Sequence, residues 1–126
     1  MATDLRRDRG ALGERLAVEH LERRGLRIVD RNFRTRHGEL DIVAVDRRAL
    51  IFCEVKTRVV GGRAGPAGPL DAIGPEKRRR LRALAREWLT STDERPWRPD
   101  IRFDAIGITL TPRGELLALE HLEGAF

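Results

Sequence analysis

Apolar positions along the chain alternate between a helical period and a strand period. Over residues 11–25 they recur at helical spacing, and the segment closes at Gly25, a residue that readily ends a helix. The pair Arg47–Arg48 separates two further apolar runs and predicts a hairpin between them. Three short runs rich in apolar and β-branched residues predict strands: 26–33, 39–46 and 50–58.

The second half of the chain continues this alternation. Residues 59–71 hold four Gly and two Pro and predict a loop. Pro75 suits the first turn of a helix that runs to about Leu89. Two closing strands are predicted over 101–110 and 115–122. The remaining segments, 1–10 and 91–100, are predicted to be a basic, frayed arm and a loop. The order α-β-β-β-α-β-β predicts one α/β domain over 1–126, with a central mixed sheet flanked by helices.

Composition restricts the class of protein. Hydrophobic residues make up 40% of 126 residues, which is enough for one packed core. No apolar run approaches the roughly 18 residues of a membrane span. The single cysteine, Cys53, excludes an internal disulfide and a cysteine-rich zinc site. The sequence MATDLRRDRG has no apolar signal region, so we expect a cytoplasmic protein.

The charge balance favours polyanionic partners. The net charge is +5 and the sequence pI is about 10.8, as in many nucleic-acid-binding proteins and in many basic proteins that bind none. All but two of the 25 cationic residues are Arg, and the exceptions are Lys56 and Lys77. Lys is a compact charge whose pKa shifts readily, so these two positions indicate either a chemical requirement or chance.

Hairpin register places acidic residues together. If the hairpin closes symmetrically about Arg47–Arg48, Asp41 lies opposite Glu54 and Glu39 lies opposite Lys56. Directly opposed residues have Cβ atoms about 4.5–5.5 Å apart. The strand period of two also places Lys56 on the same face as Glu54.

Opposed carboxylates in an apolar setting indicate a cation site. Asp41 and Glu54 are flanked by apolar residues, so they repel each other and are costly to bury unless they are neutralised. Mg²⁺ or Mn²⁺, which take carboxylate oxygens, provide that neutralisation. Lys56 can orient an attacking water or stabilise charge on a phosphate. The alternative is a surface hairpin whose acids are paired with nearby Arg.

The first helix supplies another candidate ligand. Glu14 recurs with Ala17 and Leu21 on one helical face, and an acid in an apolar stripe needs a partner. Glu14 therefore belongs to the expected cation site. The alternative is a core face centred on Leu12 and Leu16, which leaves Glu14 in solvent.

The second helix presents basic residues at its beginning. Lys77 lies one turn before Leu81 on the apolar face, where free N–H groups and the helix dipole favour phosphate. The basic run over 76–82 is either a phosphate-contacting edge or a solvated face. Beside a carboxylate–lysine site, we favour phosphate contact.

Other motifs indicate little chemistry. His20, His37 and His121 have no ligand spacing and are interpreted as ordinary residues, although His37 precedes the acidic strand and is a candidate substrate contact. The glycine-rich GGRAGPAG lacks the Lys-Ser/Thr ending of a phosphate-binding loop.

Short motifs run through the whole chain: Arg9-Gly10, Gly13-Glu14, Arg31-Asn32, Gly38-Glu39-Leu40-Asp41, Glu54-Val55-Lys56-Thr57-Arg58, Lys77-Arg78, Arg102-Phe103-Asp104 and Ala125-Phe126. Together they resemble the YraN family of uncharacterised bacterial proteins. That family is similar to the restriction-endonuclease-like superfamily, including the archaeal Holliday-junction resolvases. The resemblance implies a restriction-endonuclease-like α/β fold.

The resemblance also assigns roles to residues. The superfamily's Asp and its later Glu-x-Lys fall on Asp41, Glu54 and Lys56, and the helical Glu of the resolvases falls on Glu14. A polar residue of the superfamily's second helix falls near Lys77. The superfamily often has Pro before its Asp, where this chain has Leu.

These observations lead to an expected function. We expect an endonuclease that hydrolyses DNA phosphodiester bonds, with branched DNA as the substrate implied by the resemblance. The expected Mg²⁺ or Mn²⁺ ligands are Glu14, Asp41, Glu54 and the carbonyl of Val55, and Lys56 completes the catalytic set. Expected contacts to nucleic acid are Lys77, Arg78, Arg58, Arg31 and Arg34.

Two alternative functions and one oligomeric state remain open. A non-catalytic nucleic-acid-binding module predicts salt-dependent DNA binding that survives loss of Asp41. A protein-docking adaptor predicts no affinity for DNA. A homodimer is expected by analogy with the resolvases, through an exposed stripe of Leu12 and Leu16.

Overall fold

Seven elements follow one another in the expected order. The computed structural model describes residues 2–61, 74–93 and 95–126, with side chains from residue 8 onward. The elements are α1 (Ala2–Arg23), β1 (Arg27–Thr35), β2 (Gly38–Val45), β3 (Ala49–Val59), α2 (Pro75–Ser91), β4 (Asp100–Leu110) and β5 (Leu116–Leu122). This order confirms the predicted α-β-β-β-α-β-β arrangement.

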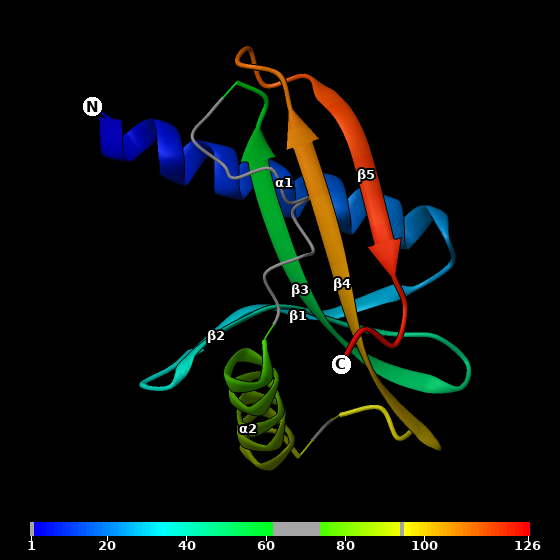
Figure 1. Cartoon of the computed structure of the whole chain (residues 1–126). Coiled ribbons are helices and arrows are strands. Elements are labelled where there is room, and N and C mark those ends of the chain that lie inside the picture. The colour runs from blue at the N-terminus through cyan, green and yellow to red at the C-terminus, as the bar shows by residue number, and fades with distance from the viewer. Residues whose placement is uncertain (1, 62–73, 94) are drawn as a thin grey trace.

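The strands form one mixed sheet. Five strands lie in the order β1-β2-β3-β4-β5, and β3 pairs parallel with β4 while the other neighbours pair antiparallel (Figure 1). Parallel neighbours need a crossover connection, and α2 lies within the segment that joins β3 to β4. The predicted mixed sheet flanked by helices is confirmed.

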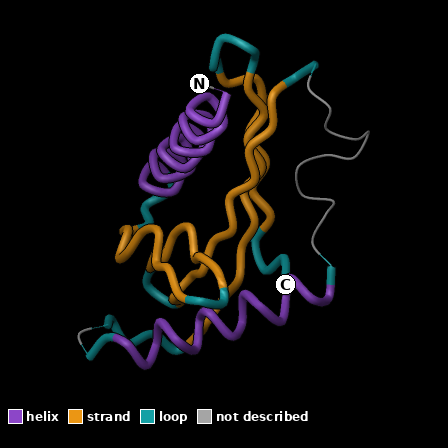
Figure 2. The backbone as a smooth tube through the Cα atoms, turned by 90° about the vertical axis from the view of Figure 1, so that its left-hand side faces the viewer, coloured by secondary structure: helices purple, strands orange, loops and turns teal. Residues whose placement is uncertain are grey.

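Each helix packs on its own part of the sheet. Figure 2 shows α1 beside the long strands, with α2 crossing at the other end of the molecule. Successive strand residues point to opposite faces, so β3 contributes to both cores. The core under α1 includes Ala17, Leu21, Ile51, Cys53 and Ile106, and the core under α2 includes Val43, Phe52, Leu81, Leu84 and Trp88.

The β2–β3 hairpin has the register that its sequence predicts, up to a limit. Val45 pairs with Leu50, and the pairing continues to Ile42 and Cys53. The ladder ends there, so Asp41 and Glu54 are not backbone partners, and neither are Glu39 and Lys56. That part of the prediction is wrong, because the Asp41 side chain accepts the Val55 N–H bond at 2.7 Å. The Asp41 side chain thus takes the place of the next backbone hydrogen bond between β2 and β3.

Helix α1 approaches β3 closely at a glycine. A Cβ atom on Gly13 would lie 1.9 Å from Oγ1 of Thr57, a distance that no real contact allows. Only glycine therefore permits this approach without a shift of the helix or the strand. Because Glu14 is the next residue, the close contact also sets its position over the sheet.

Three predictions from the sequence need correction or fall outside the structure. The predicted arm over 1–10 is wrong, because α1 already begins at Ala2; the Ala, Leu and Arg of this segment are strong helix formers. The predicted exposed stripe is also wrong, since Leu12 and Leu16 pack against the core. The predicted loop over 59–71 falls almost entirely outside the described residues. Among the described helices, none is long and apolar enough to cross a membrane.

Candidate metal centre

Asp41 stands where β2 separates from β3. Its Oδ2 atom accepts the Val55 N–H bond at 2.7 Å, and the residue is half-buried. Residues of α1, β2 and β3 all bring charge toward this point. The end of the hairpin ladder therefore creates a polar site between the helix and the sheet.

Three carboxylates meet beside this point. One oxygen each from Glu14, Glu39 and Asp41 lies within 4.8 Å of the others. Asn32 on β1 holds two of them, because its Nδ2 donates to Glu14 Oε2 at 2.7 Å and to Glu39 Oε1 at 2.8 Å. Asn32 has a φ of 54°, a left-handed conformation that Asn adopts more easily than most residues.

Like charges perturb the central acid. Burial raises the pKa of Asp41, and the negative charges of Glu54, Glu14 and Glu39 raise it further. The hydrogen bond from the Val55 N–H group lowers it but does not compensate, and the pKa of Asp41 reaches about 8. The protein alone therefore favours a proton on this carboxylate at neutral pH.

Glu54 lies on the other side of Asp41, toward α2. Glu54 is buried, with 8% of its surface exposed. Its Oε1 atom accepts from Nζ of Lys77 at 2.9 Å and lies 3.4 Å from Nζ of Lys56. Burial and the neighbouring Lys56 lower the pKa of Lys77, although the charge of Glu54 raises it. Both lysines of the chain thus meet at one buried carboxylate.

The structure brings most of the sequence candidates into one neighbourhood. Glu14 and Asp41 share the three-carboxylate group, and Glu54 is close enough to raise the pKa of Asp41. Lys56 and Lys77 stand at Glu54 rather than beside the three carboxylates.

Sequence reasoning missed Glu39 as a candidate ligand. The register argument turned Glu39 toward Lys56, whereas its carboxylate contacts Asn32 and Arg34. The signal was present, since Glu39 and Asp41 lie two residues apart on one strand and two-residue spacing returns to the same face.

The expected nucleic-acid contacts occupy different settings. Arg31, Arg34 and Arg78 are exposed, and Arg34 also forms an ion pair with Glu39 at 3.0 Å. Arg58 is half-buried on β3. Lys77 is held at Glu54 and is only 15% exposed, so its amine belongs to the acidic site more than to the surface.

A second buried carboxylate was not singled out from the sequence. Asp104 on β4 accepts two hydrogen bonds from Arg102, at 2.8 and 3.0 Å, and one from the Gly124 N–H at 3.0 Å. His121 Nε2 contacts Asp104 at 2.8 Å, and its Nδ1 lies 3.0 Å from Nε2 of His20. The histidines do pair, contrary to the interpretation from sequence, because the fold joins residues 101 positions apart.

Comparison with known proteins gives a consistent result. The model of the uncharacterised protein family UPF0102 matches residues 13–108. A UPF0102 protein of Mycobacterium sp. (strain KMS) is 46% identical over 126 residues, covering 98% of this chain and 89% of the relative. A UPF0102 protein of Mycobacterium tuberculosis (strain ATCC 25177 / H37Ra) is 46% identical over 119 residues, covering 91% of this chain and 89% of the relative.

The chain belongs to the UPF0102 family. This is the YraN family that the motifs indicate, so that prediction is confirmed. Both groups described above fall within the UPF0102 match: the acids are Glu14, Glu39, Asp41 and Glu54, and the amines are Lys56 and Lys77. The His121 contact to Asp104 lies partly beyond it.

Proposed function

We propose that this UPF0102 protein is a metal-dependent endonuclease that hydrolyses phosphodiester bonds in DNA. One observation carries the proposal: the carboxylates of Glu14, Glu39 and Asp41 converge within 4.8 Å, close to a buried carboxylate that binds two lysines. Carboxylates that are held together despite their mutual repulsion, with lysine amines beside them, suit a reaction at a phosphate group. A purely structural cluster gains nothing from such repulsion.

The donor set fits Mg²⁺ or Mn²⁺. These cations prefer oxygen ligands, and Glu14, Glu39 and Asp41 offer three carboxylate oxygens without a soft donor beside them. The raised pKa of Asp41 is the result expected of ligands assembled without their cation. Of the ligands expected from sequence, Glu54 is occupied by lysine amines, so Glu39 is the better third carboxylate. When bound, such a cation neutralises phosphate charge and lowers the pKa of bound water.

In this proposal, the two lysines lie on the side of the metal site where the substrate phosphate binds. Glu54 holds the amines of Lys77 and Lys56 at 2.9 and 3.4 Å, which fixes two positive charges next to Asp41. We assign Lys56, the more exposed of the two at 35%, to orient the attacking water or stabilise negative charge on the phosphate. Lys77 positions Glu54. The Val55 carbonyl, on the residue whose N–H binds Asp41, remains a proposed ligand.

Substrate and assembly complete the proposal. The exposed guanidinium groups of Arg31, Arg34 and Arg78 suit the DNA backbone, and Arg58 lies on the same strand as Lys56. Branched DNA is the proposed substrate by analogy with the resolvases, and the cytoplasm is the proposed location. A homodimer is part of the same analogy. Exposed Leu116, Leu117 and Leu122 on β5 offer apolar surface for it in place of the buried α1 stripe.

A cleavage assay tests this function. Branched, flapped, nicked and single-stranded DNAs are incubated with the protein and Mg²⁺ or Mn²⁺, beside an EDTA control. We expect Asp41→Asn and Glu14→Gln to lower the cleavage rate by about 10²–10³-fold, the size of loss seen when transition-state charge stabilisation is removed. Glu22→Gln removes an exposed carboxylate from the same helix as Glu14 and should leave the rate unchanged.

Three results would contradict the proposal. Cleavage that persists in both site variants would come from a contaminant or another site. Binding of DNA without cleavage under either metal would instead identify a binding module, and no binding at all would favour the docking adaptor.

A further inference from the structure

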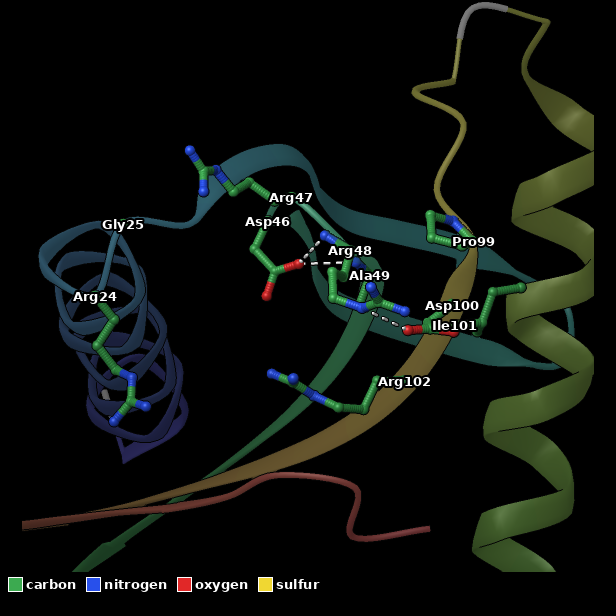
Figure 3. A pocket seen from close by; sticks show the side chains of 10 residues that line it. All are labelled: Arg24, Gly25, Asp46, Arg47, Arg48, Ala49, Pro99, Asp100, Ile101 and Arg102. Carbon is green, nitrogen blue, oxygen red and sulfur yellow. Dashed lines mark hydrogen bonds and ion pairs between the residues drawn. The ribbon is translucent and has the colours of Figure 1, made fainter.

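A second polar site lies at the far end of the β2–β3 hairpin. A pocket of about 860 Å³ opens between the C-terminal end of α1, the hairpin turn and the start of β4 (Figure 3). Four arginines and two aspartates line it: Arg24, Arg47, Arg48, Arg102, Asp46 and Asp100. Its volume is in the range of pockets that bind small ligands.

One of these arginines is held rigidly. Two nitrogens of Arg102 donate to Asp104, which is fully buried and is also bound by His121 and the Gly124 N–H. The network places the Arg102 guanidinium at the wall of the pocket before any ligand arrives. A preorganised guanidinium loses less entropy when it binds an anion.

Another arginine is uncommitted. Arg47 in the hairpin turn is exposed and, among the described residues, makes no hydrogen bond or ion pair. Arg24 and Arg48 each form one ion pair at the surface, with Glu123 at 3.0 Å and Asp100 at 3.4 Å. The pocket therefore keeps donors available for an anionic group.

Asp46 adds an acceptor to this basic pocket. Its Oδ1 atom accepts the N–H bonds of Arg48 and Ala49 at 2.8 and 2.7 Å, which fixes the turn. In Figure 3 the second carboxylate oxygen points into the space between Arg24 and Arg102. That oxygen makes no hydrogen bond among the described residues, so a ligand with an N–H donor can use it.

We propose that this pocket binds one unpaired nucleotide of a DNA strand. The arginines take its phosphate, and the free oxygen of Asp46 accepts from an amino group on its base. A nucleotide combines an anionic end with a donor-bearing base edge, which is the combination that this lining matches.

The proposal rests on the proposed function and specifies its substrate. Asp41 and Asp46 are five residues apart on and just beyond β2, which is about 17 Å at strand rise, or about five base pairs of duplex. A substrate with an unpaired segment a few base pairs from the cleavage point can occupy both sites. This arrangement occurs in branched and flapped DNA but not in plain duplex.

Fluorescence anisotropy in EDTA tests the pocket without cleavage. The probes are a labelled duplex with a cytosine flap, the same duplex with a thymine flap, and the duplex without a flap. Cytosine offers an amino donor where thymine has a carbonyl oxygen. We expect wild type to bind the cytosine flap about tenfold more tightly, as one hydrogen bond to a charged acceptor allows. Asp46→Asn keeps the Oδ1 acceptor but can donate at the other position, so it should reverse this preference.

Charge reversal provides the matched comparison. Arg47→Glu should weaken binding of both flapped probes about tenfold and lower the salt dependence of binding. Arg86→Glu makes the same charge change at an exposed position of α2 and should change affinity less than twofold. Equal losses in the two variants would show a general charge effect and overturn the proposal.

Further outcomes separate this proposal from the proposed function. Equal affinity for the two flaps in wild type, or an unchanged preference in Asp46→Asn, would overturn the pocket whatever the enzyme cleaves. Displacement of the flapped probe by free dCMP at equal concentration would assign the pocket to a free nucleotide and also overturn it. Flap binding with these preferences but without cleavage under Mg²⁺ or Mn²⁺ would support the pocket and reject the nuclease.

Discussion

Two carboxylates of the central sheet, Asp41 on β2 and Asp104 on β4, have opposite electrostatic surroundings. Asp104 is fully buried, and hydrogen bonds from His121, Arg102 and the Gly124 N–H hold its pKa below its ordinary value although burial alone would raise it. Asp41 is half-buried, but its neighbours are mainly other acids, and its pKa is raised to about 8.

The difference separates an acid that the protein itself satisfies from one that suits the proposed cation site. A buried carboxylate surrounded by donors is satisfied by the protein itself and stabilises the fold as long as its partners remain. A carboxylate that faces other carboxylates is stabilised when it takes up a proton or when a cation binds, because the neighbouring negative charges disfavour its ionised form. Asp41 is half-buried and Asp104 fully buried, and their hydrogen-bond partners distinguish them further.

Removal of the charge on Asp104 should have the largest effect on stability. Asp104→Asn leaves Arg102 and His121 without their anionic partner, and breaking one side of such a buried pair costs about 3–5 kcal/mol. Chemical denaturation at pH 7 measures the free energy of unfolding. Asp100→Asn on the same strand, where the side chain is 54% exposed, should change it by less than about 0.5 kcal/mol. A similar small change in both variants would contradict a structural role for Asp104.

The contact that positions the acidic site should respond next. Gly13→Ala places a methyl group against Thr57, and overpacking of this kind costs about 1–3 kcal/mol. Because Glu14 moves with the helix, cleavage should also fall. Gly10→Ala is the matched control: a Cβ there meets nothing within 4 Å, so it should be neutral or stabilise the helix by about 1 kcal/mol or less. Equal stability of the two variants would show that α1 does not approach Thr57 this closely.

Removal of the charge on Asp41 should give a pH-dependent gain in stability. Its folded pKa of about 8 lies above its ordinary value of 3.8, so the folded state binds more protons than the unfolded state between these values. Wild-type stability therefore loses this contribution as pH rises from about 4 to 8. Asp41→Asn should match wild type near pH 4 and be more stable at pH 9, in EDTA.

Thermal unfolding at both pH values measures this difference. Added Mg²⁺ or Mn²⁺ should raise the melting temperature of wild type more than that of Asp41→Asn, because binding stabilises the folded state. An Asp41→Asn variant that is less stable than wild type at pH 9 would mean that Asp41 is satisfied in the same way as Asp104.

Local pattern was sufficient for most of the fold. The hairpin between 39–46 and 50–58 followed from apolar runs and a two-residue link, and its register through Ile42 and Cys53 agrees with the structure. The first helix was placed correctly at its C-terminal end but begins earlier than expected, at Ala2. Helix ends without a strong breaker are decided by small differences in propensity, which one sequence does not resolve.

The site was harder to predict, because its details depend on how strands separate. Extrapolation of the register past Ile42 assumed a continuous ladder, whereas Asp41 ends the ladder with its own side chain. Glu39 instead lies opposite Arg34 in the pairing of β1 with β2, a register that the β2–β3 hairpin does not reveal. The contact between His20 and His121 depends on the packing of α1 beside β5, so spacing in the sequence carries no signal of it.

The single amide of Asn32 has a kinetic consequence. It fixes a carboxylate from the first helix and one from the second strand before any cation is present. Under the proposed function, capture of a cation requires exchange of its hydration water and loss of one proton, without reorganisation of the chain. We therefore expect association to proceed in one phase, at a rate set by dehydration of the ion, so that Mn²⁺, which sheds water faster than Mg²⁺, occupies the site sooner.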